Sequence, residues 1–267
     1  MPIFDSHTHL DDPVYDKDRD QVFARAREAG VLGFMIAGIT AETCPRAVAL
    51  AASRDDCIAS VGVHPHDARS LTEDSLARLE NLAAHEKVRA WGETGLDFNR
   101  MFSPREDQEK GFARQLQSAA RLGLPLILHE RDSGGRLLAI LKEHFGSGPI
   151  KGVVHCFSGT REELSAYLAL GLCIGVTGVL TQKERGKPLR RMLPSIPPDR
   201  LLIETDCPYL TPAPQRNKHR RNEPAFLTSV VETAGRVLGK DPREVAQLAW
   251  DNAIRLFGPT ERMIQSP

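Results

Sequence analysis

Hydrophobic residues are grouped along the chain in eight short runs, separated by polar segments. The runs cover residues 2–9, 32–40, 57–64, 88–97, 125–131, 151–157, 172–179 and 200–206. Most of them are continuously apolar and bounded by Gly or Pro, which is typical of strands buried on both faces of a parallel sheet. We therefore expect eight parallel strands joined by helices.

Three of the intervening segments carry both a start and a stop signal of a helix. Ser103 precedes Pro104 and Glu106, which is the order of an N-cap residue, a first-turn proline and a capping-box partner. The expected limits, each an N-cap followed by a glycine stop, are Ser103 and Gly123, Thr160 and Gly171, and Asp241 and Gly258.

Strands that alternate with helices over about 250 residues fit a (β/α)8 TIM barrel better than an open doubly wound sheet. We expect one such domain over residues 1–267. The glycine motifs of dinucleotide and P-loop sites do not occur in the sequence. In a barrel of this kind, active-site residues come from the C-terminal ends of several strands.

Residues able to bind metal stand late in five of the runs, and they are His7, His9, Glu93, His129, His155 and Asp206. A single such residue is more often a capping or solvent-facing side chain, but equivalent positions in five strands indicate a shared site. His7 and His9 are two apart, so both imidazoles point to one face of a strand. Burying these groups together is costly unless they bind cations. One ion rarely takes more than four protein ligands, so we expect two metal ions.

Composition and charge limit the possible partners. The 267 residues include 35 basic and 35 acidic side chains, so the formal net charge is zero and any nucleic-acid contact must come from a local patch. The five cysteines are odd in number and widely spaced, and no apolar run approaches the roughly 20 residues of a membrane span. We expect a cytoplasmic protein with reduced thiols, no membrane contact and no obligate protein partner, with a monomer as the default.

Seven stretches resemble the signatures of the TatD family of metal-dependent hydrolases, a branch of the amidohydrolase-like barrels. They are Asp5 to Leu10, Gly62 to His66, Gly92 to Phe98, His129 to Asp132, His155 to Thr160, Glu204 to Leu210 and Arg221 to Pro224. They follow the family's order across nearly the whole chain. The resemblance implies a divalent-metal-dependent deoxyribonuclease, and some members of the family are 3′-to-5′ exonucleases that act on single-stranded DNA ends.

The same resemblance implies the roles of the site residues: His7, His9 and Asp206 hold one metal, His129 and His155 hold the other, and Glu93 bridges them. Related amidohydrolase barrels often bridge their metals with a modified lysine, and the glutamate favours phosphodiester over C–N hydrolysis. Asp206 also takes a proton from the attacking water as general base. The two divalent ions can be Mg2+, Mn2+ or Zn2+, because imidazoles suit zinc or manganese while the family's nuclease assays use magnesium.

Five residues are candidates for substrate contacts: His64, His66, Arg131, Arg220 and Arg221. The two histidines end the third run and are explained equally well as loop caps. Arg131 can pair with a phosphate or form a structural salt bridge. Arg220 and Arg221 belong to a basic group, residues 216–221, in the loop from Pro208 to Asn222. Its place after the eighth run favours phosphate recognition, whereas we expect a second basic group, residues 183–191, to be a solvated face.

Two other functions stay open. The same metal chemistry serves a hydrolase of an ester or amide bond, such as that of a mischarged aminoacyl-tRNA or a small molecule. A binding protein that had lost catalysis lacks a metal ligand or a base, and the sequence lacks neither. A nuclease that acts on single-stranded DNA ends is the leading hypothesis.

Overall fold

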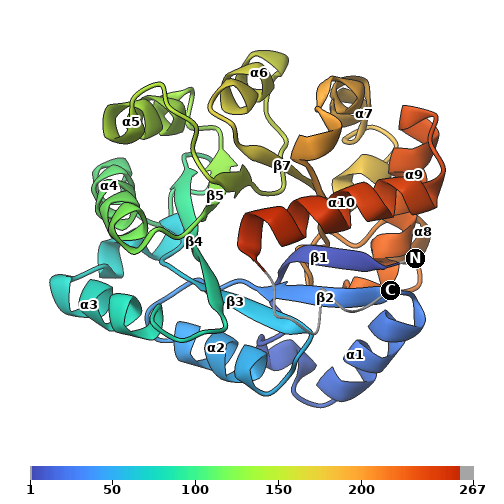
Figure 1. Ribbon diagram of the computed structural model, residues 1–267, viewed down its shortest axis with the longest axis horizontal. Helices are drawn as coiled ribbons and strands as arrows, with labels where there is room; N and C mark the ends of the chain where they lie inside the picture. The colour runs from blue at the N-terminus through green and yellow to red at the C-terminus, as the bar shows by residue number, and fades with distance from the viewer. Residues whose placement is uncertain (1, 259–267) are drawn as a thin grey trace.

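Eight parallel strands follow one another in chain order around a barrel in the computed structural model, which describes residues 2–258 (Figure 1). The strands are β1 (Ile3–Thr8), β2 (Val31–Ile36), β3 (Cys57–Val61), β4 (Val88–Asp97), β5 (Leu126–Arg131), β6 (Gly152–Val154), β7 (Cys173–Val176) and β8 (Leu201–Ile203). Backbone hydrogen bonds join His9 N to Cys207 O at 2.9 Å and Asp206 N to His7 O at 3.0 Å, and so connect the last strand region to the first. The prediction of a (β/α)8 barrel is confirmed.

Helices surround the barrel and connect its strands (Figure 1). The α-helices are α1 (Arg19–Glu28), α2 (Cys44–Ala52), α3 (Glu73–Leu82), α4 (Arg105–Leu122), α5 (Arg136–Phe145), α6 (Arg161–Ala169), α7 (Lys187–Met192), α8 (Ala213–Arg216), α9 (Leu227–Leu238) and α10 (Pro242–Phe257). Short 3-10 helices are η1 (Pro13–Tyr15), η2 (Pro65–Ser70), η3 (Gly178–Thr181), η4 (Leu193–Ser195), η5 (Pro198–Arg200) and η6 (Pro224–Phe226). Among residues 2–258, no helix is both long and apolar enough to cross a membrane.

The start of α4 differs from the prediction. Pro104 is the N-cap, and the Ser103 hydroxyl makes no capping bond. That hydroxyl instead donates to His66 O at 2.8 Å and accepts from Arg69 N at 3.2 Å, so it ties together the loops after β3 and β4. Gly171 lies two residues beyond the end of α6. The remaining helix limits are confirmed by the caps at Gly123, Thr160, Asp241 and Gly258.

Several strands are shorter than the apolar runs that predicted them. β6 has three residues and β8 has three, so His155 and Asp206 lie in the loops that directly follow these strands. The loop after β8 also contains the short helix α8. The expected site residues therefore stay at the C-terminal end of the barrel, although two of them lie outside the strands.

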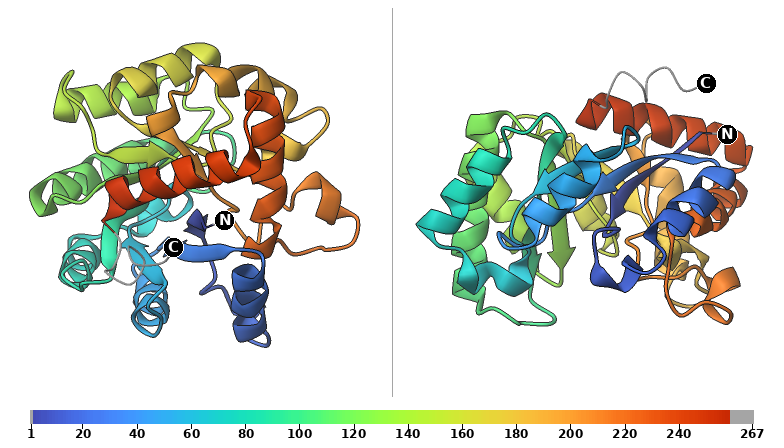
Figure 2. Two further views of the ribbon diagram at one scale, coloured as in Figure 1. Left: turned by 45° about the vertical axis from the view of Figure 1, so that its right-hand side comes forward. Right: turned by 90° about the horizontal axis from the view of Figure 1, so that it is seen from below.

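Apolar side chains close the other end of the barrel interior. Each strand contributes one buried residue to this layer, and they are Phe4, Met35, Ile58, Ala90, Ile127, Val153, Cys173 and Leu202. Trp250, Ala253 and Phe257 of α10 pack against it, with the Trp250 ring 6.0 Å from the ring of Phe4. Figure 2 shows α10 lying across this end, on the opposite side of the molecule from α8. Removing this surface from water stabilises the barrel.

Candidate active site

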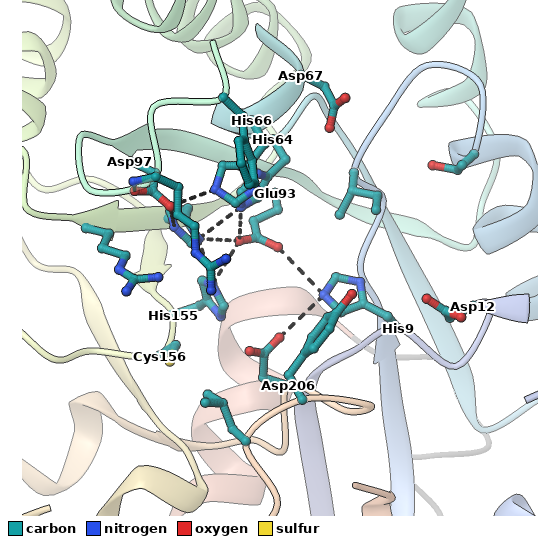
Figure 3. A pocket seen from close by; sticks show the side chains of 18 of the residues that line it. His9, Asp12, His64, His66, Asp67, Glu93, Asp97, His155, Cys156 and Asp206 are labelled. Carbon is teal, nitrogen blue, oxygen red and sulfur yellow. Dashed lines mark hydrogen bonds and ion pairs between the residues drawn. The ribbon is translucent and has the colours of Figure 1, made fainter. Parts of the chain in front are cut away.

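The C-terminal end of the barrel contains a cavity of about 660 Å³, a size common for ligand sites. Imidazoles and carboxylates from several strands converge on it (Figure 3). The histidines and acids that line its inner wall are His9, His64, His66, Glu93, Asp97, His129, His155 and Asp206. His7 is fully buried beneath them. The expected convergence of strand ends on one place is therefore present.

One oxygen of the Glu93 carboxylate faces the first group of donors. Glu93 Oε2 lies 3.1 Å from His7 Nε2 and 3.8 Å from His9 Nε2. The two imidazole Nε2 atoms are 3.3 Å apart, as their spacing on one strand predicts. Asp206 Oδ1 completes the group at 3.4 Å from His9 Nε2. The donor atoms of His7, His9 and Asp206 are close enough to ligate a single cation.

The other Glu93 oxygen faces a second group. Oε1 lies 2.6 Å from His129 Nδ1, 2.9 Å from His155 Nε2 and 3.2 Å from His64 Nε2. His64 was expected only as a substrate contact or a loop cap. Its Nδ1 does cap η2 by accepting from His66 N at 3.1 Å, while its Nε2 points into the second group. A histidine after a buried apolar run is the same signal that identified His129 and His155.

The carboxylates and imidazoles of the site shift one another's pKa values. Burial alone raises the pKa of Glu93, but the imidazoles of His155, His64 and His7 outweigh it and hold this pKa well below its ordinary value. Burial lowers the pKa of His64 to about 4, so its ring is neutral at pH 7, with Nδ1 accepting from His66 N and Nε2 carrying the proton. Burial also lowers the pKa of His9, but Asp206 and Glu93 oppose this and raise it to about 9 in the absence of an ion. A cation entering the first group therefore replaces a proton on His9.

Irregular strand pairing turns two of these residues towards the barrel interior. Phe4 and Ala90 point into the apolar layer, and strict alternation along β1 and β4 would turn His7 and Glu93 to the opposite face. The register shifts within β1 and within β4, in the segments that contain these two residues. Such irregularities re-aim side chains and are frequent beside active sites.

A buried carboxylate supports His155 from behind. Glu204 Oε1 lies 3.4 Å from His155 Nδ1 and accepts from Cys156 N at 2.5 Å, while Ser6 Oγ donates to Oε2 at 3.1 Å. Gly175 leaves room for this carboxylate, since a Cβ there would lie 2.6 Å from both oxygens. Glu204 therefore fixes the ring that points its other nitrogen at Glu93.

Asp97 is a second buried carboxylate that supports histidines of the site, in this case His66 and His129. Its Oδ2 lies 2.7 Å from His66 Nε2 and 3.6 Å from His129 Nε2. Burial raises the pKa of Asp97, but the contacts with His129 and His66 outweigh it and lower the pKa below its ordinary value. The sequence contains Asp97 in one of the family-like stretches but gave no reason to assign it a role. Its ionised carboxylate orients both imidazoles.

Three arginines line the cavity without a partner for their side chains in residues 2–258: Arg100, Arg131 and Arg185. Arg131 was expected here as one of two alternatives, and no structural salt bridge occupies it within the described chain. Arg185 belongs to the basic group that we expected to be a solvated face; it is exposed, yet it also forms part of the wall. Nothing in the sequence pattern singled out Arg100. Unpaired guanidinium groups at a cavity wall can bind phosphate.

Arg221, which we expected to contact substrate, has partners within the protein. Its guanidinium donates to both carboxylate oxygens of Asp18 at 2.8 and 2.6 Å and to Val14 O at 2.9 Å. It also stacks on the ring of Tyr15, 4.5 Å from the centroid. Arg221 thus fastens the loop after β8 to η1 and α1, and it does not line the cavity. Arg220 is exposed and does not line the cavity.

Comparison with known proteins agrees with this geometry. The model of the TatD-related DNase family matches residues 4–258. A protein of Rahnella sp. named 3′-5′ ssDNA/RNA exonuclease TatD is 46% identical over 263 residues, which cover 97% of this chain and the whole of that protein. A protein of Pectobacterium parmentieri with the same name is 43% identical, over 96% of this chain and 99% of its own.

Solved structures share the architecture. A TatD homologue from Escherichia coli superimposes with a TM-score of 0.86 at 31% identity, covering 96% of this chain and 98% of its own. The phosphotriesterase homology protein of Escherichia coli, at 16% identity and a TM-score of 0.66 over 96% of this chain and 98% of its own, shares the fold alone. The family match extends over every element of the barrel and every residue that faces Glu93. The chain therefore belongs to the TatD-related DNase family.

Proposed function

We propose that this chain is a divalent-metal-dependent exonuclease that hydrolyses phosphodiester bonds at the 3′ ends of single-stranded DNA. The observation that carries the proposal is the Glu93 carboxylate, whose two oxygens face two separate groups of buried imidazoles. The names of the relatives, which are exonucleases of single-stranded DNA and RNA, support the substrate class. All five cysteines are free, which supports a reducing compartment such as the cytoplasm.

The chemistry of the donors fits two ions. We assign His7, His9 and Asp206 to one ion, His129 and His155 to the other, and one oxygen of Glu93 to each. His64 lies beside the second group, but its Nδ1 accepts from His66 N, so its Nε2 carries the ring proton and faces Glu93 Oε1 as a donor. Nitrogen and carboxylate donors in these numbers suit Zn2+ and Mn2+, and Mg2+ when water completes its shell. When bound, two such ions would lower the pKa of a water molecule and would neutralise the charge that develops on the phosphate oxygens.

Asp206 is placed to accept the proton of the attacking water. Burial raises its pKa, but contact with His9 and the nearby imidazoles outweighs this and lowers it, so the carboxylate is ionised at neutral pH. His9 engages Oδ1, and among residues 2–258 no side chain occupies Oδ2. Asp206 is also in the left-handed region at φ +56°, which aspartate tolerates better than most residues. We propose that Oδ2 takes the proton as general base.

The unpaired arginines provide phosphate contacts away from Glu93. We propose Arg131, Arg100 and Arg185 for this role, because they line the cavity and have no partner in the described chain. His66 keeps its proposed substrate contact, since its ring is held by Asp97 at the cavity wall. We do not propose Arg220 and Arg221 as phosphate contacts, because neither lines the cavity.

Cleavage of a labelled oligonucleotide tests the proposal. Metal-stripped protein should leave a 5′-labelled single-stranded DNA intact, and addition of Mg2+, Mn2+ or Zn2+ should produce a ladder that shortens from the 3′ end. Circular single-stranded DNA is the matched control for exonuclease action and should remain uncut.

The result also separates the alternative function. An oligonucleotide left intact with each of the three metals would contradict the proposed nuclease. Metal-dependent release of the amino acid from an aminoacyl-tRNA, under the same conditions, would instead favour an ester hydrolase.

A further inference from the structure

The two exposed aromatic side chains of the chain both line the cavity. The sequence has ten Phe, three Tyr and two Trp, and all of them lie within residues 2–258. Every aromatic side chain other than Phe102 and Tyr209 is buried or half-buried. Phe102 is 51% exposed and Tyr209 is 56% exposed, and both form part of the cavity wall. Large apolar groups left in water beside a site indicate a surface that meets a ligand.

The two rings stand on opposite sides of Glu93. Phe102 packs edge-on against His66, 4.7 Å between ring centroids, and His66 adjoins His64 of the second donor group. Tyr209 packs edge-on against His9 of the first donor group at 6.0 Å. A phosphate placed at Glu93 therefore has one aromatic ring to each side.

Hydrogen bonds fix the backbone at Phe102 and Tyr209, while the two rings remain exposed to solvent. Tyr209 N donates to Asp206 O at 2.9 Å, and Asn222 Nδ2 donates to Tyr209 O at 2.7 Å. Phe102 O accepts from the Arg69 guanidinium at 2.5 Å. Fixed attachment with an exposed face is what a stacking platform needs, because little conformational entropy is lost when a flat group binds.

The surroundings of the rings indicate the chemistry of the occupant. The unpaired guanidinium groups of Arg100, Arg131 and Arg185 share the wall with Phe102 and Tyr209. The occupant thus combines flat apolar groups with negative charge, as a nucleotide chain does. A purely apolar partner would leave the arginines and the carboxylates at the centre of the cavity unsatisfied.

We propose that Phe102 and Tyr209 stack on the two nucleobases that flank the bond to be cleaved. The inference rests on the proposed function, since it takes the phosphate at Glu93 to be the reacting one. Both bases must leave their neighbours in order to stack on the rings, which a single-stranded end permits and a paired end resists. The two side chains therefore select single strands without reading sequence.

Alanine variants and abasic substrates test the stacking directly. Phe102→Ala and Tyr209→Ala should each raise KM for a single-stranded oligo(dT) by roughly 5- to 150-fold, the range expected for loss of one stacked base, with little change in kcat. Phe102→Tyr and Tyr209→Phe keep a ring and should keep the wild-type KM. Leu122→Ala, at an apolar residue that is 41% exposed and ends α4 outside the cavity lining, is the control and should change nothing.

The second substrate is an oligonucleotide that lacks the bases on both sides of its last 3′ linkage. With it, the alanine variants form a double-mutant cycle between each ring and its base. Wild-type enzyme should show the raised KM on this substrate, and the alanine variants should add no further loss, because the partner of each ring is already absent. Alanine variants that lose the same factor on the normal and the abasic substrate would overturn the proposal, and so would alanine variants with unchanged KM.

Binding separates this inference from the proposed function. A labelled, cleavage-resistant phosphorothioate oligo(dT) reports affinity without hydrolysis. Stacking would be supported and the nuclease contradicted if wild-type protein binds this oligonucleotide, the alanine variants bind it more weakly, and wild-type protein cleaves no DNA. Wild-type protein that cleaves DNA and whose alanine variants bind as tightly as wild type would support the nuclease and overturn stacking. Failure of wild-type protein to bind would overturn both.

Discussion

The two ends of the barrel interior have opposite chemistry, although the same eight strands supply both. At the end covered by α10, every strand contributes one buried side chain to an apolar layer, and Trp250 and Phe257 pack on it. At the other end, strand and loop residues bring imidazoles and carboxylates around Glu93. Burial stabilises the first end and is costly for the second unless cations bind. Stability and chemistry are therefore separated in space, and substitutions at the two ends should have separable effects.

The largest expected effect is at Asp206. Asn keeps the shape and one oxygen ligand, and it tolerates the left-handed backbone, but it cannot accept a proton at neutral pH. Asp206→Asn should lower kcat by roughly 10²- to 10⁴-fold, with a smaller change in KM and an unchanged melting temperature. Kinetics on an oligonucleotide, with metal content measured in the same sample, provide the check. Near wild-type kcat at full metal occupancy would mean that another group is the base.

A substitution at the apolar end should show the reverse pattern. Trp250 is buried against Phe4, so Trp250→Ala should lower the free energy of unfolding by about 3–5 kcal/mol. The folded fraction should keep its kcat, because no atom of this layer reaches the cavity. Urea unfolding and kinetics at low temperature measure the two quantities. A loss of kcat in fully folded Trp250→Ala would show that the two ends are coupled.

The carboxylate behind His155 should give an intermediate effect. Glu204→Gln keeps the size that fits over Gly175 but removes the charge beside His155 Nδ1. We expect the second-group ion to bind about 10- to 100-fold more weakly, the usual result of losing a partner of a ligating histidine. Mn2+ titration of metal-stripped protein by calorimetry measures this. Excess Mn2+ should restore kcat, and a kcat that stays low at saturation would instead give Glu204 a part in the chemistry.

The smallest effects should separate two arginines, Arg131 and Arg221, that the sequence put forward as substrate contacts. Arg131→Ala should raise KM for oligonucleotides and reduce the salt dependence of binding by a slope of about 1, because one phosphate contact is lost. Arg221→Ala should leave KM unchanged and lower the free energy of unfolding by roughly 1 kcal/mol or less, since its pair with Asp18 is partly exposed. Salt-dependent binding and thermal unfolding of both variants provide the comparison. An equal rise in KM for Arg131→Ala and Arg221→Ala would mean that Arg221 contacts the substrate.

Local patterns in the sequence were sufficient for the fold and for most of the site. Buried parallel strands read as continuous apolar runs, and each of the eight runs overlaps a strand. Because the ends of parallel strands meet at one edge, the sequence alone predicts that residues far apart in the chain, such as His7, His129 and Asp206, lie together. Caps at Thr160 and Asp241 were likewise visible, since an N-cap bond is made within one turn.

Contacts between distant segments could not be predicted in this way. The Ser103 hydroxyl bonds to the loop after β3 instead of capping α4, because a partner 37 residues away competes with the local bond. Arg221 has its carboxylate partner in Asp18, about two hundred residues earlier, whereas Arg100 and Arg185 were left without one among the described residues. Charge alone did not distinguish these arginines, because only the folded chain decides which guanidinium groups are paired.

The sequence by itself determined which side chains the site would have; the tertiary structure decided which way two of them point. An alternating pattern counted from Phe4 and Ala90 turns His7 and Glu93 away from the barrel axis, yet register shifts in β1 and β4 bring both inward. The side-chain period of a strand is two, so a single irregularity reverses every later residue. Such a shift depends on the pairing of neighbouring strands, which is a property of the closed barrel and has no signal in the local sequence.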